Sequence, residues 1–383
     1  MKKVILVFLS FIFAESIMYS QSKTNDLPII DLSKNYPKKE IILQDIADVE
    51  YVSLETTDDV LLCGSSTGDF SVLFHVSDQY ICTYELFRGE IFIFNRSGKI
   101  VHHFNRKGQS GREYTSIMNV IFDEKNEEIF VCTHYQSILV YTPNGEYKRT
   151  LKPIKKYEAY NFDDETLLVF DEVVANTTPQ KNPYHLISKK DGSTVDVFDI
   201  TLPKRYSNVF EIEPGHQIKV SSSNRRYYGN DFVIADMSSD TIFLLTQNKE
   251  LTPLLARKPS VHASEPRKIW TNILTTDKFI LIGLLTLDFQ SKNTGGRVPV
   301  LMYEFETGEI SVESIKNAEY SAIDGWGSEH KSFTIAKNMT AELISISQLK
   351  EQAERKMLTK DFAKYVSKLD EDDNPIVRIV TFK

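Results

Sequence analysis

Short apolar segments alternate with polar turns along most of the chain, in a pattern that repeats. Each unit has an apolar segment, a few polar residues, a second apolar segment, a turn containing Gly, Asn or Asp, and a third segment. Segments of this length, rich in β-branched and aromatic residues and bounded by turn residues, predict strands rather than helices. A unit that recurs in this way is typical of a repeat architecture. The first strands of the units are residues 80–83, 129–132, 167–170, 232–235, 279–282 and 333–336.

The second strands show which unit is incomplete. They are residues 91–94, 138–141, 184–187, 242–245, 300–303 and 376–380. Turns that follow the first five supply the positive-φ positions that hairpins need, and each turn leads into an outer strand. The last second strand has no such turn, so its unit lacks an outer strand of its own. Residues 50–54, which precede the first unit, are left over, and we expect them to pair beside residues 376–382.

This arrangement predicts an all-β fold, a six-bladed β-propeller closed by an N-terminal strand in the last blade. Closure of this kind removes the open sheet edges that a linear array would expose. Two stretches interrupt the repeat. Apolar residues at three- and four-residue spacing predict a short helical insertion in the last blade, at residues 341–369. The gap at residues 208–230 predicts an excursion from the ring.

Small residues occupy similar places in five of the first strands, namely Cys82, Cys132, Ala235, Gly283 and Ala336. We expect these strands to converge on the central channel, where bulky side chains would collide. That position favours a packing role for Cys82 and Cys132 over a redox role. With Cys63 they make 3 Cys in the chain, an odd and sparse count. Such a count argues against a disulfide framework and leaves one pair open.

The N-terminus has the pattern of a targeting signal. Lys2 and Lys3 precede an apolar run at residues 4–13 that is too short to span a bilayer. We therefore expect residues 1–20 to be a cleaved signal peptide, residues 21–48 an N-terminal extension, and residues 49–383 the propeller. No Cys follows the apolar run, so a lipid anchor at that place is not expected. These features predict export to the periplasm or the extracellular space.

Composition narrows the classes of partner. Hydrophobic residues are 41% and charged residues 26% of the 383 residues, which is typical of globular rather than disordered protein. The formal net charge of −8 makes general nucleic-acid binding unfavourable. After the signal segment, no further apolar stretch is long enough to span a membrane.

Three segments carry a resemblance to a known family. They are residues 49–56 (VEYVSLET), residues 93–99 (IFNRSGK) leading into residues 106–114 (RKGQSGREY), and residues 372–375 (DDNP) before the last strand. On these segments the chain resembles the exported Bacteroidetes-type six-bladed propeller proteins, which are related to NHL-repeat propellers. The resemblance covers essentially the whole mature chain and implies the fold and export, without a particular activity. The family loop usually reads Gly-x-Gly-Pro-Gly-Glu-Tyr, and here Ser110 and Arg112 replace residues of that pattern.

The loop after the first outer strand is the first candidate site. It joins that strand to the next blade, on the face of a propeller where ligands usually bind. Arg106, Lys107 and Arg112 offer positive charge, and Tyr114 offers a stacking surface. The alternative is that glycines form a tight turn between blades, which Glu113 and Tyr114 hold in place.

Two further candidates combine cations or aromatic rings with a loop position. One is the run of Arg225, Arg226, Tyr227 and Tyr228, which suits an anionic or sugar ligand but also fits a solvated insertion. The other is Trp326, flanked by glycines, which is either a stacking platform or a residue that fills the core. No His or Cys cluster has the spacing of a zinc site, so neither metal nor cofactor is expected.

The favoured function is an exported binding module, acting as a monomer on an extracellular small molecule, a glycan or a protein partner, without catalysis. One alternative is a propeller enzyme, a lyase or hydrolase that acts on glycans at a site in the central channel. Another is a structural interaction protein in an envelope complex. Clustered carboxylates or His residues in the channel would favour the enzyme. A large exposed apolar patch would favour the partner role.

Overall fold

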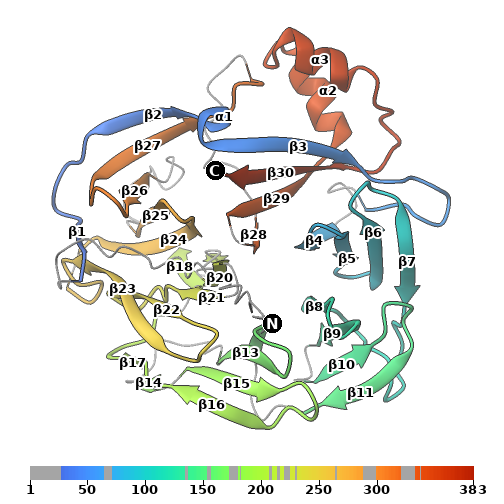
Figure 1. Cartoon of the computed structure of the whole chain (residues 1–383), viewed down its shortest axis with the longest axis horizontal. Helices are drawn as coiled ribbons and strands as arrows, with labels where there is room; N and C mark the ends of the chain where they lie inside the picture. The colour runs from blue at the N-terminus through green and yellow to red at the C-terminus, as the bar shows by residue number, and fades with distance from the viewer. Residues whose placement is uncertain are drawn as a thin grey trace, which may run out of the picture.

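The computed structural model of the protein describes residues 27–63, 71–133, 137–152, 157–171, 180–181, 183–206, 209–213, 216–219, 225–228, 231–263, 265–287, 299–320, 333–336 and 338–383. Six small sheets are arranged in a ring, with the inner strands near the axis and the outer strands along the perimeter (Figure 1). The prediction of a six-bladed β-propeller is therefore confirmed. The expected signal peptide, residues 1–20, lies outside the described residues.

The first three blades follow one another along the chain, each with four antiparallel strands. Blade 1 consists, from the axis outward, of β4 (Ser71–Val76), β5 (Tyr80–Glu85), β6 (Glu90–Asn95) and β7 (Ile100–Asn105). Blade 2 consists of β8 (Asn119–Asp123), β9 (Glu128–Cys132), β10 (Ile138–Tyr141) and β11 (Tyr147–Leu151). Blade 3 consists of β12 (Tyr157–Asn161), β13 (Thr166–Asp171), β15 (Tyr184–Ser188) and β16 (Thr194–Phe198).

The last three blades each take a strand from the N-terminal segment. Blade 4 consists of β20 (Arg225–Tyr228), β21 (Asp231–Ile234), β22 (Thr241–Leu245), β23 (Leu251–Lys258) and β1 (Ile29–Asp31). Blade 5 consists of β24 (Arg267–Thr275), β25 (Phe279–Leu287), β26 (Val300–Glu304), β27 (Ile310–Lys316) and β2 (Lys38–Ile42). Blade 6 consists of β28 (Phe333–Ala336), β29 (Met339–Ile344), β30 (Ile376–Phe382) and β3 (Ala47–Ser53).

Short elements fill the connections between these strands. They are α1 (Leu43–Ile46), the pair β14 (Gln180–Lys181) and β17 (Thr201–Leu202), the hairpin β18 (Val209–Glu213) and β19 (His216–Lys219), and the helices α2 (Ile346–Glu354) and α3 (Lys360–Val366). In the part of the chain that the structure describes, no helix combines the length and apolar character needed to cross a membrane.

Blade 6 is completed as the sequence predicts. Strand β3 runs antiparallel to β30, from the pair of Ala47 with Phe382 to the pair of Ser53 with Ile376. The two ends of the chain thus share one ladder, and blade 6 has an outer strand like its neighbours. Figure 1 shows β3 lying across the outside of β30 and pointing toward blade 1.

Asn374, directly before β30, fastens the segment that leaves β3. Its side-chain amide donates to the carbonyl oxygens of Glu55 and Val60, both at 2.8 Å, and its Oδ1 accepts from the backbone N–H of Leu62 at 2.8 Å. Its own backbone N–H donates to Oγ1 of Thr56 at 2.8 Å. The side chain is buried and its hydrogen-bonding capacity is largely used, so it holds the first crossover against the closing strand.

The hydrophobic core lies between neighbouring blades. One apolar cluster joins blades 1 and 2 through Ile93 and Val131, and similar clusters fill the later interfaces. Cys82 belongs to the first cluster and Cys132 to the cluster between blades 2 and 3, and both side chains are buried. Cys63, Cys82 and Cys132 are all free thiols, so the pair that the sequence left open does not form. Both buried Cys residues have the predicted packing role.

The place predicted for the small residues is wrong for all of them except Ala336, which lies in β28, the innermost strand of blade 6. Cys82 lies in β5 and Cys132 in β9, the second strands of their blades, and not in the innermost strands at the channel. The apolar pattern marks second and third strands because these are sandwiched between other strands and buried on both faces. The innermost strands β4, β8, β12, β20 and β24 escape the pattern.

The helical insertion is shorter than predicted. Residues 341–344 belong to β29, which pairs with β30 from Met339 with Thr381 to Ile344 with Ile376. The helices begin only at Ile346. Phe362 of α3 packs against Tyr51 of β3 with ring centroids 4.9 Å apart, so the insertion rests on the closing strand.

Residues 29–42, expected in an extension before the propeller, add strands to it. Strand β1 pairs in parallel with β23, and β2 pairs in parallel with β27. Together with β3 they form an N-terminal belt, defined as β1, β2 and β3, along the outer edges of blades 4, 5 and 6 (Figure 1). The belt covers backbone groups that would otherwise form exposed sheet edges.

We expect deletion of residues 49–55 to abolish the single cooperative unfolding transition of the chain, because it removes most of β3 and opens the ring. Thermal unfolding followed by circular dichroism measures this. Deletion of residues 27–31 is the matched control, since it removes β1 from a blade that already has four strands. Equal melting temperatures for the 49–55 deletion and the full mature chain would show that closure does not stabilise the fold.

We expect Asn374→Ala to lower the free energy of unfolding by about 2 kcal/mol or more, because it leaves a buried N–H and two buried carbonyl oxygens without their partner. Urea titration of the mature chain measures the loss. Asn248→Ala, at an exposed turn residue, serves as the control. A loss no larger than in that control would contradict the role given to Asn374.

Candidate functional site

The loop between β7 and β8, the first candidate, is a crossover whose central side chain, Tyr114, is buried and fully hydrogen-bonded. The Tyr114 ring is buried, its hydroxyl donates to the carbonyl oxygen of Gly89 at 2.6 Å, and that hydroxyl accepts from the backbone N–H of Arg106 at 2.9 Å. Backbone hydrogen bonds also join Tyr114 to Arg106 and Gly108. Burial raises the pKa of Tyr114 above its ordinary value. The ring therefore holds two blades together and offers no surface on which a ligand could stack.

The cations of this loop remain at the surface. Arg106, Lys107 and Arg112 are exposed. Nε of Arg106 donates to the carbonyl oxygen of Gly145 at 2.7 Å, and Nζ of Lys107 donates to that of Phe87 at 2.5 Å. Carbonyl partners hold these side chains in place without neutralising their charge. The loop thus keeps positive charge on a fixed backbone.

The other two candidates are not brought to this loop by any described contact. Residues 225–228, which include Arg225, Arg226, Tyr227 and Tyr228, form β20, the innermost strand of blade 4, and pair with β21. The expected excursion is instead the β18–β19 hairpin, which precedes β20. Trp326 lies outside the described residues.

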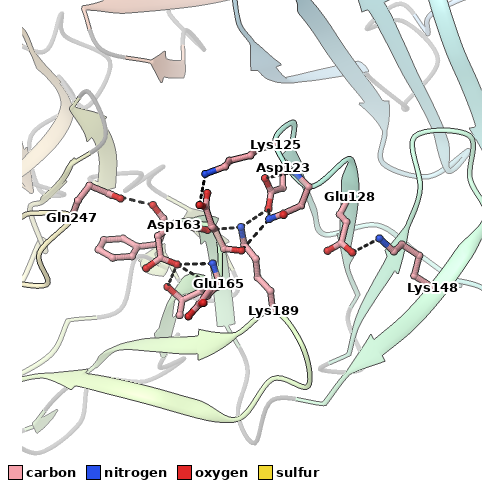
Figure 2. Close-up of polar contacts among 12 residues, drawn as sticks. Asp123, Lys125, Glu128, Lys148, Asp163, Glu165, Lys189 and Gln247 are labelled. Atoms are coloured by element: carbon pink, nitrogen blue, oxygen red, sulfur yellow. Dashed lines mark hydrogen bonds and ion pairs between the residues drawn. The ribbon is translucent and has the colours of Figure 1, made fainter.

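A network of ion pairs joins blades 2 and 3, and Figure 2 shows it. Lys189, in the turn after β15, donates from Nζ to Oδ2 of Asp123 at 2.5 Å and to the carbonyl oxygen of Asp163 at 2.5 Å. Both Lys189 and Asp123 are buried. Gln247 of blade 4 makes the matching contact one blade further on, donating from Nε2 to the carbonyl oxygen of Phe162 at 3.0 Å.

Carboxylates in this network already have partners. Glu128 accepts hydrogen bonds from Nη1 and Nη2 of Arg149, at 2.7 and 2.6 Å, and also contacts Lys148. Oδ1 of Asp163 accepts from backbone N–H groups of its own turn. Among the residues that the structure describes, no group of three His, Cys, Asp or Glu side chains could hold a metal ion. We therefore interpret the network as a connection between blades rather than as a catalytic pair.

A cluster that the sequence analysis missed lies between blades 4 and 5, and we call Lys204, Tyr206, Arg257, His262 and Arg267 the Tyr206 cluster. The guanidinium carbon of Arg267 lies 3.9 Å from the Tyr206 ring centroid, and Nζ of Lys204 lies 5.3 Å from it. The Tyr206 hydroxyl lies 3.2 Å from Nδ1 of His262. Two cations and an imidazole thus surround one buried aromatic ring.

Three connections of the chain meet to build the cluster. Tyr206 ends the described part of the crossover after β16, and its backbone N–H donates to Oγ of Ser238 in the β21–β22 connection at 2.9 Å. In the crossover after β23, the N–H of Val261 donates to Oδ1 of Asp240 at 2.6 Å. An apolar floor lies beneath them, formed by Met237, Val261, Ile269 and Leu287.

Two guanidinium N–H groups in the cluster have no hydrogen-bond partner within the described residues. They are Nε of Arg267 and Nη2 of Arg257, and both atoms are buried. Arg257 is only 5% exposed, its ion-pair partner Asp240 lies 4.0 Å away, and its other nitrogens donate to carbonyl oxygens. Burial lowers the pKa of Arg257 to about 10, so it is still a cation at neutral pH. Unsatisfied cationic donors of this kind bind carboxylate, sulfate or phosphate oxygens.

The sequence missed this cluster because its members come from crossovers more than 50 positions apart. One signal was available. Lys204, Arg205 and Tyr206 follow an outer strand, as Arg106, Lys107 and Tyr114 do. Arg267 and Lys268 open β24, the innermost strand of blade 5. Comparison of the crossovers with one another would have singled out the one at Tyr206, because it combines Lys, Arg and Tyr as the one at Tyr114 does.

Comparison with family models gives one match, a domain of unknown function (DUF4934), over residues 27–381. The chain belongs to the DUF4934 family. The match begins before β1, so this DUF4934 chain includes the N-terminal belt within the family domain. No curated protein matches it.

Two of the solved structures similar to this DUF4934 chain come from Bacteroides species. One is from Bacteroides fragilis NCTC 9343, a protein whose name describes it as exported. It has a TM-score of 0.62 at 12% identity, over 90% of this chain and 99% of that one. Another is a DUF4221 family member from Bacteroides vulgatus, with a TM-score of 0.49 at 10% identity, over 89% and 99% of the two chains. The match to the B. fragilis protein confirms, at the level of fold, the resemblance that the sequence indicates.

We expect Lys189→Met to lower the free energy of unfolding by about 3–5 kcal/mol, because Asp123 would be left as a buried charge without its partner. Urea denaturation measures the change, with Lys190→Met at the exposed neighbouring position as the control. Adding Asp123→Asn to Lys189→Met should recover part of the loss. Equal stability of Lys189→Met and Lys190→Met would exclude a stabilising role for the pair.

Proposed function

We propose that this DUF4934 protein is an exported binding protein that takes an anionic ligand at the Tyr206 cluster. The observation that carries the proposal is the pair of buried guanidinium N–H groups, on Arg257 and Arg267, for which the described part of the chain offers no hydrogen-bond partner. A buried donor that makes no hydrogen bond costs free energy, and more so when it is charged. An anionic oxygen that accepts from these groups removes that cost. The free energy of binding is therefore more favourable by the cost that the unsatisfied donors impose on the free protein.

The charge of the cluster supports an anion over a neutral sugar. Lys204, Arg257 and Arg267 bring three positive charges, whereas the described ion-pair partners are Asp240 at 4.0 Å and the exposed Glu265 at 3.6 Å. These distances are long for ion pairs, and the chain as a whole has a net charge of −8. Positive charge gathered at one place on an acidic protein attracts and orients an anion.

The geometry also favours a ligand group held from several sides. The Tyr206 ring keeps the Arg267 guanidinium in one orientation, and the apolar floor excludes water from below. A preorganised guanidinium binds planar carboxylates and sulfates with little loss of side-chain entropy. The ligand class is therefore a small molecule or glycan that carries a carboxylate or sulfate group.

Export and a monomeric state belong to the same proposal. The N-terminal signal pattern supports export, and so does the name of the similar B. fragilis protein. The ligand would be met in the periplasm or outside the cell.

A glycan lyase is the second candidate function, favoured by one observation. The Tyr206 hydroxyl and Nδ1 of His262 are 3.2 Å apart beside the Arg267 guanidinium. A phenol and an imidazole in contact can exchange a proton, and a guanidinium can stabilise a carboxylate substrate. Appearance of an unsaturated sugar product during the binding assay below would favour this candidate.

We expect an oligogalacturonate or a chondroitin sulfate oligosaccharide to raise the melting temperature of the mature protein, because a ligand that binds the native state stabilises it. The fully methyl-esterified oligogalacturonate, which has the same sugars without charge, should give no shift. Calorimetric titration of Arg267→Gln should show affinity for the charged ligand reduced about tenfold or more, as expected for a lost charge-assisted hydrogen bond.

Two controls separate binding from folding. Arg112→Gln removes an exposed cation on another crossover and should bind like the wild type. Lys204→Gln, which leaves Arg267 on the Tyr206 ring, should weaken binding without changing the melting temperature of the free protein. Equal shifts with the charged and the esterified ligand, or unchanged affinity in Arg267→Gln, would contradict the proposal.

A further inference from the structure

We infer that a second surface, on blade 1, docks an acidic segment of a partner protein. We call it the Phe87 patch and define it as Leu61, Phe87, Arg88, Lys107 and Met118. None of these residues belongs to the Tyr206 cluster. The inference therefore goes beyond ligand binding and assigns a protein partner to a different part of the ring.

The patch exposes large apolar side chains. Phe87 is 56% exposed, Leu61 is 49% exposed and Met118 is 42% exposed. Single exposed hydrophobic residues are ordinary on a protein surface, whereas several together mark interaction sites. Aromatic residues, Met and Arg are also the types enriched in protein interfaces.

Contacts between the segments bring these side chains to one region. Nη1 of Arg88 donates to Sγ of Cys63 at 3.0 Å, which places the β5–β6 turn beside the segment that carries Leu61. Nζ of Lys107 donates to the carbonyl oxygen of Phe87 itself at 2.5 Å. The Tyr84 hydroxyl, at the end of β5, donates to the carbonyl oxygen of Met118 at 3.3 Å.

The exposed charge of the patch is positive. The Arg88 side chain is half exposed, and Lys107 is exposed beside it. Glu85, which pairs with Arg88 at 3.3 Å, is buried beneath it and does not reach the surface of the patch. In the adjoining loop, the Glu113 carboxylate accepts from the backbone N–H of Ser110 at 2.9 Å, and this hydrogen bond lowers its pKa. An apolar surface with a cationic rim fits a segment that combines acidic and apolar side chains.

The backbone under the patch is fixed before any partner arrives. Tyr114 fastens the crossover to Gly89, and Gly89 itself has a positive φ of 82°. The N–H of Lys107 donates to Oδ1 of Asn105 at 2.8 Å. A surface that is already ordered loses little conformational entropy on binding, which favours recognition by a protein.

The test uses the full mature chain and a fluorescein-labelled peptide of alternating Glu and Leu residues. Fluorescence anisotropy should show binding that weakens as salt is raised, because exposed charges contribute. The same peptide with every Glu replaced by Gln should bind at least tenfold more weakly. Phe87→Ala should also weaken binding about tenfold, as truncation of an interface anchor does, and Lys107→Ser should reduce the salt dependence.

Val197→Ala is the matched control, because Val197 is another exposed apolar residue, on the outer strand of blade 3. It should bind the peptide like the wild type. Arg267→Gln should also keep peptide binding, so failure of the anion site and failure of this patch are distinguishable. Phe87→Ala should melt like the wild type, since the side chain is exposed.

Two results would overturn the inference. Equal affinity for the Glu and Gln peptides, or equal effects of Phe87→Ala and Val197→Ala, would show that the patch does not select acidic segments. A dimer in light scattering that Phe87→Ala dissociates would assign the patch to a second copy of the chain instead.

Discussion

The ladder between β3 and β30 is the interaction on which the rest of the structure depends. Every blade of a closed ring buries both of its faces against neighbours, and this holds only while the last blade is complete. Seven consecutive residues of β3 pair with seven of β30, from Ala47 to Ser53. Asn374 and the packing of Tyr51 on Phe362 add to the same joint. Opening it would expose the inner faces of blades 1 and 6 together.

The crossovers between blades show what the ring makes available for function. The strands repeat, but each crossover meets a different set of neighbours. At one crossover the Tyr114 side chain leaves no group for a ligand, because the buried Tyr114 hydroxyl both donates and accepts a hydrogen bond. The crossovers at Tyr206 and His262 hold buried guanidinium N–H groups that have no partner among the described residues. The hydrogen bonds of Tyr114 explain the first arrangement structurally, whereas the second carries a free-energy cost that an anionic ligand would remove.

The sequence predicts the elements whose signals are local. Turn residues and apolar runs locate the second, third and outer strands, and the missing turn after the last strand reveals the closure. Five of the six innermost strands are missed because an edge strand at the axis has mixed polarity, as Tyr157–Asn161 in β12 has. The end of β29 is taken for a helix because Leu343 continues the three- and four-residue spacing of Ile346, Leu349 and Ala353 in α2. The Tyr206 cluster escapes because it depends on which crossovers become neighbours in space.

The N-terminal belt also imposes an order of events on a chain that is synthesised from its N-terminus. Strands β1, β2 and β3 emerge first, yet their partners β23, β27 and β30 are synthesised last. Blades 1 to 3 are built from contiguous segments and have all their strands early. The belt must therefore stay unpaired until the second half of the chain arrives. The ring can therefore close only when the whole polypeptide has been synthesised. A truncated chain would keep unpaired sheet edges, which proteases could cleave and other chains could pair with.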